Sequence, residues 1–180
     1  MRKYLILIAI LILASILRLY NLAGNPPGLT WDEAAFGYNA YSIWLTGRDE
    51  YGSFLPLNLK SFGDYKPALY AYIDIPFIAL LGLNELAVRL PSALFGIGMV
   101  FMTFLLVLEL FKNKPLALFS AFFMAISPLS IQFTRPGYEI GLALFLTMSG
   151  AYFFIKGLTY QKLLILSAII HFDANKANQV

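Results

Sequence analysis

Five ionisable side chains in this sequence have types and positions that could do chemistry. They are an adjacent acidic pair, a lysine in the same polar stretch, and an arginine and a glutamate four residues apart, namely Asp32, Glu33, Lys66, Arg135 and Glu139. A carboxylate can accept a proton from an attacking hydroxyl, and a cationic side chain can bind phosphate oxygens. Acids and bases that lie near apolar helices are functional candidates by default. These five residues form a candidate site if the fold brings them to one side of the protein.

The acidic pair also has a purely structural interpretation. Thr30 precedes Glu33 by three residues, which is the pattern of a capping box that opens an amphipathic helix through about Thr46. Capping accounts for Thr30 and Glu33, and it leaves Asp32 as a favourable charge at the positive end of the helix dipole.

The remaining candidates have structural interpretations of their own. Lys66 could anchor a helix at the lipid headgroups. Arg135 and Glu139 have the spacing of an i,i+4 ion pair, which is worth roughly 0.2–0.5 kcal/mol on an exposed helix. The single histidine, His171, lacks the partners that a metal site requires. Taken one pair at a time, none of these signals is specific, and no metal site is expected.

The composition indicates that lipid surrounds most of the chain. Of the 180 residues, 59% are hydrophobic and only 13% are charged, whereas a soluble domain carries roughly 25% charged residues. The absence of cysteine excludes a disulfide scaffold and a Cys-ligated metal site. The net charge of +3 is small and scattered, so a nucleic-acid partner is not expected.

Long runs without charge predict the membrane-spanning helices. A spanning helix needs ~20 mainly apolar residues. We expect spans at about 4–23, 86–111, 115–133 and 138–155, with a partial fifth at 163–172. The predicted fold is therefore an all-α membrane protein with four to five transmembrane helices. Residues 24–85 are expected to form a long first extracytoplasmic loop that carries interfacial helices.

One apolar segment inside that loop competes with the second span. Residues 67–83 are interrupted by Asp74 and Pro76, whereas residues 86–111 are longer and uncharged at their centre. We therefore place 67–83 as an interfacial or partly re-entrant helix. Arg89, near the end of the second span, is expected to snorkel to the headgroups.

The basic residues orient the predicted spans. Arg2 and Lys3 precede the first apolar run, which we interpret as an uncleaved helix because no signal-peptide cleavage motif follows it. The positive-inside rule places this N-terminus in the cytoplasm, together with the tight turns that carry Lys112, Lys114, Lys156 and Lys162. The five candidate residues then face the extracytoplasmic side of a multi-pass membrane protein.

Several motifs, read in order, resemble one family. They are LTWDEA at 29–34, DYKPALY at 64–70, NELAVRLPSALFG at 84–96, and Ser127-Pro128 leading to Arg135 and Glu139. Together they resemble the N-terminal part of the dolichyl-phosphate-mannose protein mannosyltransferases. They are also similar to the bacterial aminoarabinose transferases that modify lipid A, which share that C-type glycosyltransferase fold. The resemblance extends from residue 1 to about residue 168.

The resemblance implies a polytopic glycosyltransferase that uses a polyprenyl-phosphate sugar donor. Such an enzyme transfers a hexose or pentose to an extracytoplasmic acceptor with inversion at the anomeric carbon. The acceptor could be a protein, a lipid or a glycan. No cofactor is implied, although an acidic pair near a phosphate leaves room for a divalent cation.

The resemblance also assigns roles to the five residues. Asp32 matches the catalytic acid and is expected to be the general base, with Glu33 supporting its orientation. Lys66 matches the lysine that contacts the carrier phosphate. Arg135 resembles a second phosphate or carboxylate partner, and Glu139 matches an acidic position that orients acceptor or donor.

The end of the chain departs from the family. Relatives are several times longer, and residues 173–180 turn polar in a way that does not match them, so a truncated or frame-shifted product is expected and the 180 residues alone are expected to be inactive. The alternative is a non-catalytic accessory protein, or half of a split transferase, that binds lipid phosphate. A secondary transporter is less favoured, because the ionisable residues lie at one face and not at the midplane of the spans.

Overall fold

The computed structural model describes residues 2–61, 63, 65–158, 160 and 162–177 and is mostly helical. Its elements are α1 (Arg2–Leu19), α2 (Trp31–Thr46), β1 (Asn58–Lys60), β2 (Tyr65–Pro67), α3 (Leu69–Leu81), α4 (Glu85–Phe111), α5 (Lys114–Ile126), α6 (Pro128–Thr134), α7 (Glu139–Gly157) and α8 (Lys162–Ala177).

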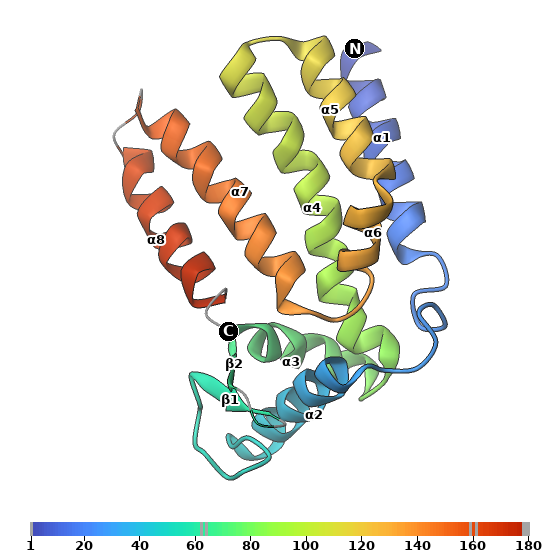
Figure 1. Ribbon diagram of the computed structural model, residues 1–180, viewed down its shortest axis with the longest axis vertical. Helices are drawn as coiled ribbons and strands as arrows, with labels where there is room; N and C mark the ends of the chain where they lie inside the picture. Colours follow the sequence, from blue (N-terminus) through green and yellow to red (C-terminus); the bar gives the residue numbers. More distant parts are fainter. Residues whose placement is uncertain (1, 62, 64, 159, 161, 178–180) are drawn as a thin grey trace.

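The long helices form an upright bundle, and a layer of short elements closes one end of it. In Figure 1, α1, α4, α5, α7 and α8 stand side by side, while α2, α3 and the two strands lie across the lower end. The start of α1 and the turn between α4 and α5 lie at the opposite end. The turn between α6 and α7 faces the layer, so the segments with the five candidate residues meet at one end of the bundle.

Two helices have the length and apolarity needed to cross a membrane. These are α4 and α7, and the bent pair of α5 and α6 is a third if it counts as one span. The described part of α1 with placed side chains, residues 5–19, is also apolar but is shorter than a span requires. Helix α3 is likewise apolar and short. The fold is thus helical as predicted, with two to three candidate spans by length and composition where we expected four to five.

The expected continuous span at 115–133 is broken at Ser127. The two pieces, α5 and α6, meet at an angle of 59°. Pro128 has no N–H and disfavours the helical conformation of the residue before it, and Ser127 accordingly has an extended ψ of 118°. The Ser127 side chain then caps α6 by accepting a hydrogen bond from the Ser130 N–H.

The other boundaries shift by smaller amounts. Helix α1 ends at Leu19 and not at 23, α7 lies within two residues of the expected span at 138–155, and α8 continues to Ala177, past the expected end at 172. Residues 178–180 of the expected polar tail lie outside the described residues.

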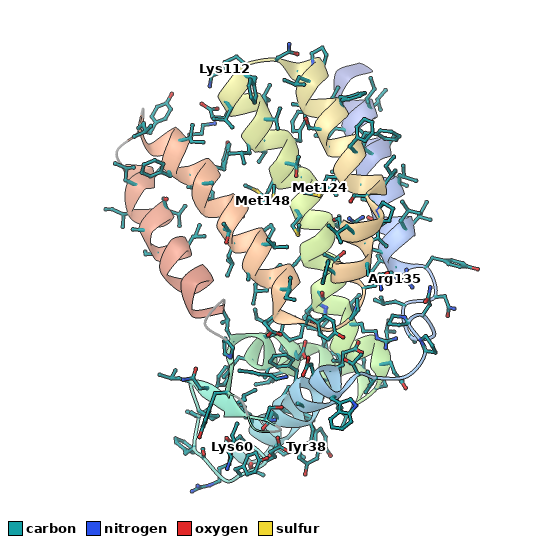
Figure 2. The ribbon with its side chains drawn as sticks, in the orientation of Figure 1. Tyr38, Lys60, Lys112, Met124, Arg135 and Met148 are labelled. Carbon is teal, nitrogen blue, oxygen red and sulfur yellow. The ribbon has the colours of Figure 1, made fainter. Side chains whose placement is uncertain are left out.

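The end of the bundle away from the α2–α3 layer is basic. It carries Lys112, Lys114 and Lys156, and Figure 2 labels Lys112 there. Glu109 is flanked by two of these lysines, with a hydrogen bond from Lys112 and an ion pair of 3.8 Å with Lys156. Three lysines of separate helices thus gather at this end of the bundle.

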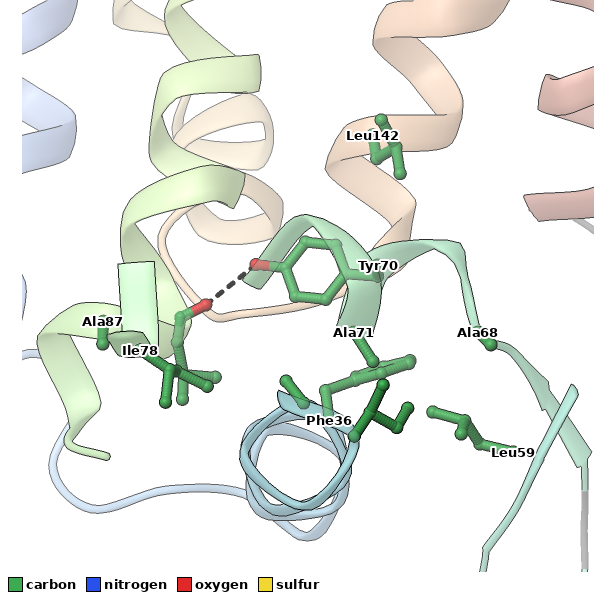
Figure 3. Close-up of a cluster of buried hydrophobic side chains, with 11 residues drawn as sticks. Phe36, Leu59, Ala68, Tyr70, Ala71, Ile78, Ala87 and Leu142 are labelled. Atoms are coloured by element: carbon green, nitrogen blue, oxygen red, sulfur yellow. Dashed lines mark hydrogen bonds between the residues drawn. The ribbon is translucent and has the colours of Figure 1, made fainter. Parts of the chain in front are cut away.

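Two buried clusters hold the bundle and the layer together. In the bundle, alanines on α1 and α5 are fully buried and let the helix backbones approach closely. In the layer, Phe36 of α2 packs edge-on against Tyr70 of α3, with ring centroids 5.2 Å apart. Figure 3 shows this second cluster, in which the Tyr70 hydroxyl donates a hydrogen bond to the Val88 carbonyl of α4. The layer is therefore fixed to the bundle by apolar packing and by a buried hydrogen bond.

Asp74 of α3 is buried completely, and neither of its carboxyl oxygens has a hydrogen-bond partner in the described part of the chain. We expected this helix to lie at the membrane interface because it contains Asp74. In the structure the Asp74 carboxyl is instead buried within the protein. Burial raises the pKa of the Asp74 carboxyl to about 9. The group is therefore neutral at physiological pH, which avoids the much larger cost of an isolated buried charge.

We expect Asp74→Asn to stabilise the fold increasingly as the pH rises from about 4 to about 9. The folded-state pKa is raised, so the folded protein must hold a proton that the unfolded chain loses above about pH 4, which costs about 4 kcal/mol at pH 7. Thermal melting in detergent at pH 5 and pH 8 measures the difference. A gap between variant and wild type that does not widen with pH would contradict the burial of an orphaned carboxyl.

Asp49→Asn is the matched control for this experiment. The Asp49 carboxylate is also buried, but its Oδ1 accepts hydrogen bonds from the Tyr51 and Ser53 N–H groups at 3.0 and 2.7 Å. Asparagine at this position keeps the accepting oxygen but loses the charge that strengthens both bonds, so the melting temperature should fall slightly, opposite to the effect at Asp74.

Candidate functional site

Asp32 and Lys66 form an ion pair at the start of α2. The Lys66 ammonium donates a hydrogen bond to Oδ1 of Asp32. Its side chain is 8% exposed, whereas that of Asp32 is 49% exposed. No hydrogen bond to Oδ2 of Asp32 is present among the described residues. The pair thus presents a half-exposed carboxylate beside a largely buried cation.

The strand ladder determines where Lys66 lies. Strands β1 and β2 are antiparallel, with Leu59 opposite Lys66. Because these two residues face each other, their side chains leave the ladder on the same side, and both are buried against α2. The Lys66 ammonium lies 5.9 Å from the centroid of the Phe36 ring, a cation–π contact on the helix that carries Asp32.

Helix α2 begins with the capping box that the sequence predicts. The Thr30 hydroxyl accepts a hydrogen bond from the Glu33 N–H, and Glu33 Oε2 accepts one from the Thr30 N–H at 2.9 Å. The cap fixes the first turn, and with it the direction of the adjacent Asp32 side chain. It accounts for only part of the role of Glu33.

Glu33 is fully buried and joins three segments of the chain. Its Oε1 accepts a hydrogen bond from Nε of Arg89 at 2.7 Å and another from the Gly137 N–H at 3.0 Å. Arg89 lies on α4, and Gly137 lies in the turn that joins α6 to α7. Glu33 therefore ties the helix that carries Asp32 to the bundle.

This network keeps Glu33 ionised. Burial raises the pKa of the Glu33 carboxyl, but hydrogen bonds from Arg89 and from the Thr30 and Gly137 N–H groups, with the Arg89 charge, lower it more, so the net pKa lies below its ordinary value. A permanently charged carboxylate whose two oxygens already accept hydrogen bonds cannot exchange a proton readily. Its geometry suits a positioning residue.

Arg89 is a residue that the sequence interpretation placed wrongly. We expected it to snorkel to the headgroups, but it is fully buried. Besides Glu33, its guanidinium donates to backbone carbonyls of the loop between α1 and α2, namely those of Leu22, Ala23, Pro26 and Gly28. A signal for this role was present: the acidic pair carries two charges, and Lys66 balances only one of them.

Arg135 uses its guanidinium to hold the end of α1. It donates to the carbonyls of Leu17, Arg18, Tyr20, Asn21 and Asn25, several of which have no helical partner at a helix end. Figure 2 shows Arg135 beside the loop that follows α1. Its fixed hydrogen bonds are thus to the backbone of this chain. It lies at the same end of the bundle as Asp32 and Lys66 but makes no recorded bond to either.

Arg18 does the same for the broken helix pair, whereas its place at the end of the first apolar run predicts that it snorkels to the interface. It is fully buried and donates to the carbonyls of Met124 and Ala125 at the end of α5, and to the hydroxyls of Ser130 and Thr134 on α6. Thus one buried guanidinium supports the bend at Ser127.

Glu139 occupies the first turn of α7, two residues after Gly137, and is half-buried. An acidic residue is favourable there because of the helix dipole. Arg135 and Glu139 do not share a helix as the i,i+4 spacing predicts, because α6 ends at Thr134 and α7 begins only at Glu139. Glu139 is linked to the centre of the site through the Gly137–Glu33 hydrogen bond.

The structure thus brings together Asp32, Glu33 and Lys66, and holds Arg135 and Glu139 on either side of Gly137. Among the described residues no group of three or more acidic or histidine side chains could hold a metal ion. Chemically, the arrangement offers a half-exposed carboxylate, an adjacent ammonium group, and a buried ion pair that fixes the helix carrying the carboxylate.

Comparison with known proteins gives one match. A family model described as dolichyl-phosphate-mannose-protein mannosyltransferase matches residues 8–169, which is most of the chain. Neither the curated proteins nor the solved structures contain a significant match.

Proposed function

Because the chain belongs to the dolichyl-phosphate-mannose-protein mannosyltransferase family, whose members are membrane glycosyltransferases that use a lipid-linked sugar, we propose that it carries the catalytic end of such a transferase. The sugar passes from a polyprenyl-phosphate carrier to an acceptor hydroxyl, and the configuration of the anomeric carbon is inverted. The observation that supports this is the ion pair between half-exposed Asp32 and buried Lys66.

Asp32 is the general base of the proposed reaction. The acceptor oxygen attacks the anomeric carbon while the bond from that carbon to the phosphate oxygen breaks, and the phosphate leaves with the electron pair. Asp32 Oδ2 takes the acceptor proton, since Oδ1 already accepts the hydrogen bond from Lys66. Attack from the face opposite the phosphate gives inversion.

Lys66 is the direct ligand of the leaving phosphate. The phosphate gains negative charge as the glycosidic bond breaks, and a largely desolvated ammonium stabilises that charge more strongly than one in water. Arg135 adds positive charge at the same end of the bundle, while its hydrogen bonds remain on the α1 carbonyls. Glu33 and Glu139 position the site, the first through Arg89 and the second through the turn at Gly137.

The proposed orientation follows from the charges at the two ends of the bundle. The basic end with Lys112, Lys114 and Lys156 lies in the cytoplasm, and the α2–α3 layer lies on the extracytoplasmic side. A carrier lipid in the outer leaflet would then present its phosphate at the level of the layer. No cofactor is required, and a divalent cation beside the carrier phosphate would act as an additional charge.

Replacing Lys66 with methionine should raise the KM for the lipid donor roughly 10- to 100-fold, the loss expected for one hydrogen bond to a charged group. The assay measures transfer of radiolabelled sugar from a polyprenyl-phosphate donor. It uses membranes isolated from cells that express the gene in its native form. Lys60→Met is the matched control, because Lys60 lies on the neighbouring strand but is exposed. An unchanged donor KM in Lys66→Met would exclude Lys66 as the phosphate ligand.

The same assay separates the enzyme from a non-catalytic lipid-phosphate binder. A binder would retain the donor in a Lys66-dependent manner without producing any glycosylated product in the wild type. Digestion of the product with anomer-specific glycosidases tests inversion directly.

A further inference from the structure

The ladder that carries Lys66 has an edge with open backbone groups. Strand β1 pairs only with β2, since the sheet has two strands in the described part of the chain. The side of β1 away from β2 is therefore an edge. Asn58 and Lys60 of this strand are exposed, while Leu59 between them is buried.

The phase of the hydrogen bonds determines which β1 groups face this edge. In an antiparallel ladder, hydrogen-bonded and non-hydrogen-bonded pairs alternate. The Ala68 N–H donates to the Leu57 carbonyl at 3.1 Å, so the pair two residues further along, Leu59 with Lys66, is hydrogen-bonded as well. The pair between them includes Pro67, which has no N–H to donate, in agreement with this phase.

It follows that the N–H and carbonyl groups of Asn58 and Lys60 point away from β2. No hydrogen bond from these four groups to another described residue is recorded. Two donors and two acceptors spaced two residues apart are the template to which an extended polypeptide adds as a new strand.

An added strand would place its side chains in register with the site. Leu59 and Lys66 leave the ladder on the face that packs against α2, where Lys66 bonds Asp32. Strands lie about 4.8 Å apart, so the residue of the new strand opposite Leu59 projects toward the same face, about 10 Å from the Lys66 backbone. For transfer, a hydroxyl-bearing residue beyond the paired segment must then reach Asp32, which bonds Lys66 on this same face.

The segment before β1 supplies apolar surface for such a strand. Tyr51, Phe54 and Leu57 are 57%, 67% and 79% exposed, so three large apolar side chains of this segment are open to a ligand. The Lys60 ammonium lies 5.1 Å from the centroid of the Tyr51 ring, so the aromatic group borders the strand itself. In Figure 2, Lys60 lies at the far end of the layer from the bundle.

We infer that β1 binds the acceptor as an extended polypeptide, which pairs with the backbone of Asn58 and Lys60 and delivers a serine or threonine hydroxyl to Asp32. This rests on the function proposed above, and it adds where the protein acceptor named by the family binds and which backbone groups hold it. Because the recognition is by backbone, the acceptor sequence matters less than its ability to extend.

A scan with N-methylated peptides tests this inference. The probe is a fluorescent ten-residue peptide of valine and threonine with one central serine, and its affinity for the Asp32→Asn protein in nanodiscs is measured without turnover. Methylation removes one peptide N–H at a time. We expect about 5- to 10-fold weaker binding when the methyl group is on alternate residues that face β1, and little change on the residues between. Uniform insensitivity, or weakening without alternation, would overturn the inference.

A pair of variants at one position provides the matching change in the protein. Lys60→Pro removes the outward N–H, whereas Lys60→Ala keeps it and removes only the side chain. Proline is tolerated at a strand edge. Peptide binding should weaken in Lys60→Pro and stay near wild type in Lys60→Ala, and equal effects of the two would contradict pairing with the backbone.

The inference and the proposed function can fail separately. The peptide assay measures binding and needs no sugar transfer. If the effect of N-methylation on affinity alternates along the peptide but the wild-type protein never transfers sugar, only the proposed function is rejected. Conversely, transfer to the peptide with no alternation would reject the strand-addition inference and leave Asp32 and Lys66 in their proposed roles.

Discussion

Asp32→Asn is expected to lower kcat for sugar transfer by about 10²- to 10⁴-fold, the contribution typical of a positioned general base. The asparagine carbonyl oxygen can still accept the hydrogen bond from Lys66, so the ladder and α2 keep their geometry. What the variant loses is an oxygen basic enough to take the acceptor proton. Donor binding should change little, because the phosphate ligand is retained.

The measurement is single-turnover transfer of labelled sugar, with the membrane-inserted amount of each variant determined separately. Glu109→Gln is the control, since it makes the same change from carboxylate to amide at the opposite end of the bundle and should leave kcat unaltered. Turnover at the wild-type rate in Asp32→Asn would reject the assignment of Asp32 as the base.

Glu33→Gln and Arg89→Met are each expected to destabilise the protein by about 3–5 kcal/mol, because either leaves an uncompensated charge in a fully buried site. The first leaves a guanidinium without its carboxylate, and the second leaves a carboxylate without its guanidinium. Both also release α2 from the bundle, so transfer activity should fall together with the melting temperature.

The double variant Glu33→Gln/Arg89→Met separates the charge effect from the loss of contacts. Removing both partners leaves no isolated charge, so the double variant should be more stable than the sum of the single changes predicts. Breaking the Glu109–Lys112 pair, in which the lysine is exposed, provides a reference and should shift the melting temperature little. Additive single effects would show that the buried pair contributes nothing as a pair.

Hydropathy predicted the positions of the long helices because a helix surrounded by lipid needs a long run of apolar side chains. The expected spans at 86–111 and 138–155 match α4 and α7 to within two residues at each end. Hydropathy did not predict the break at Ser127. One proline changes the mean hydropathy of a span-length window only a little, but it removes a backbone N–H that a continuous helix needs. The same two residues, Ser127 and Pro128, are part of the motifs that resemble the family.

The candidate site was predictable in part for a similar reason. The capping box is local, so Thr30 and Glu33 could be assigned from spacing alone. The partnership of Glu33 with Arg89 joins residues 56 positions apart, and no periodicity encodes it. Arg135 was expected to bind phosphate, but its hydrogen bonds go to backbone carbonyls. The last carbonyls of a helix need hydrogen-bond donors from elsewhere in the chain. Composition does not reveal which residue supplies them.

The buried guanidinium of Arg18 has a consequence for how the protein is made. Its partners Met124 and Ala125 are synthesised more than 100 residues later. Until they emerge from the ribosome, the Ala14 carbonyl of its own helix is available to Arg18, and water or lipid headgroups must solvate the rest of the guanidinium. The contacts that bury Arg18 therefore form only after α5 and α6 have been made, so the packing of the first helix is completed late in synthesis.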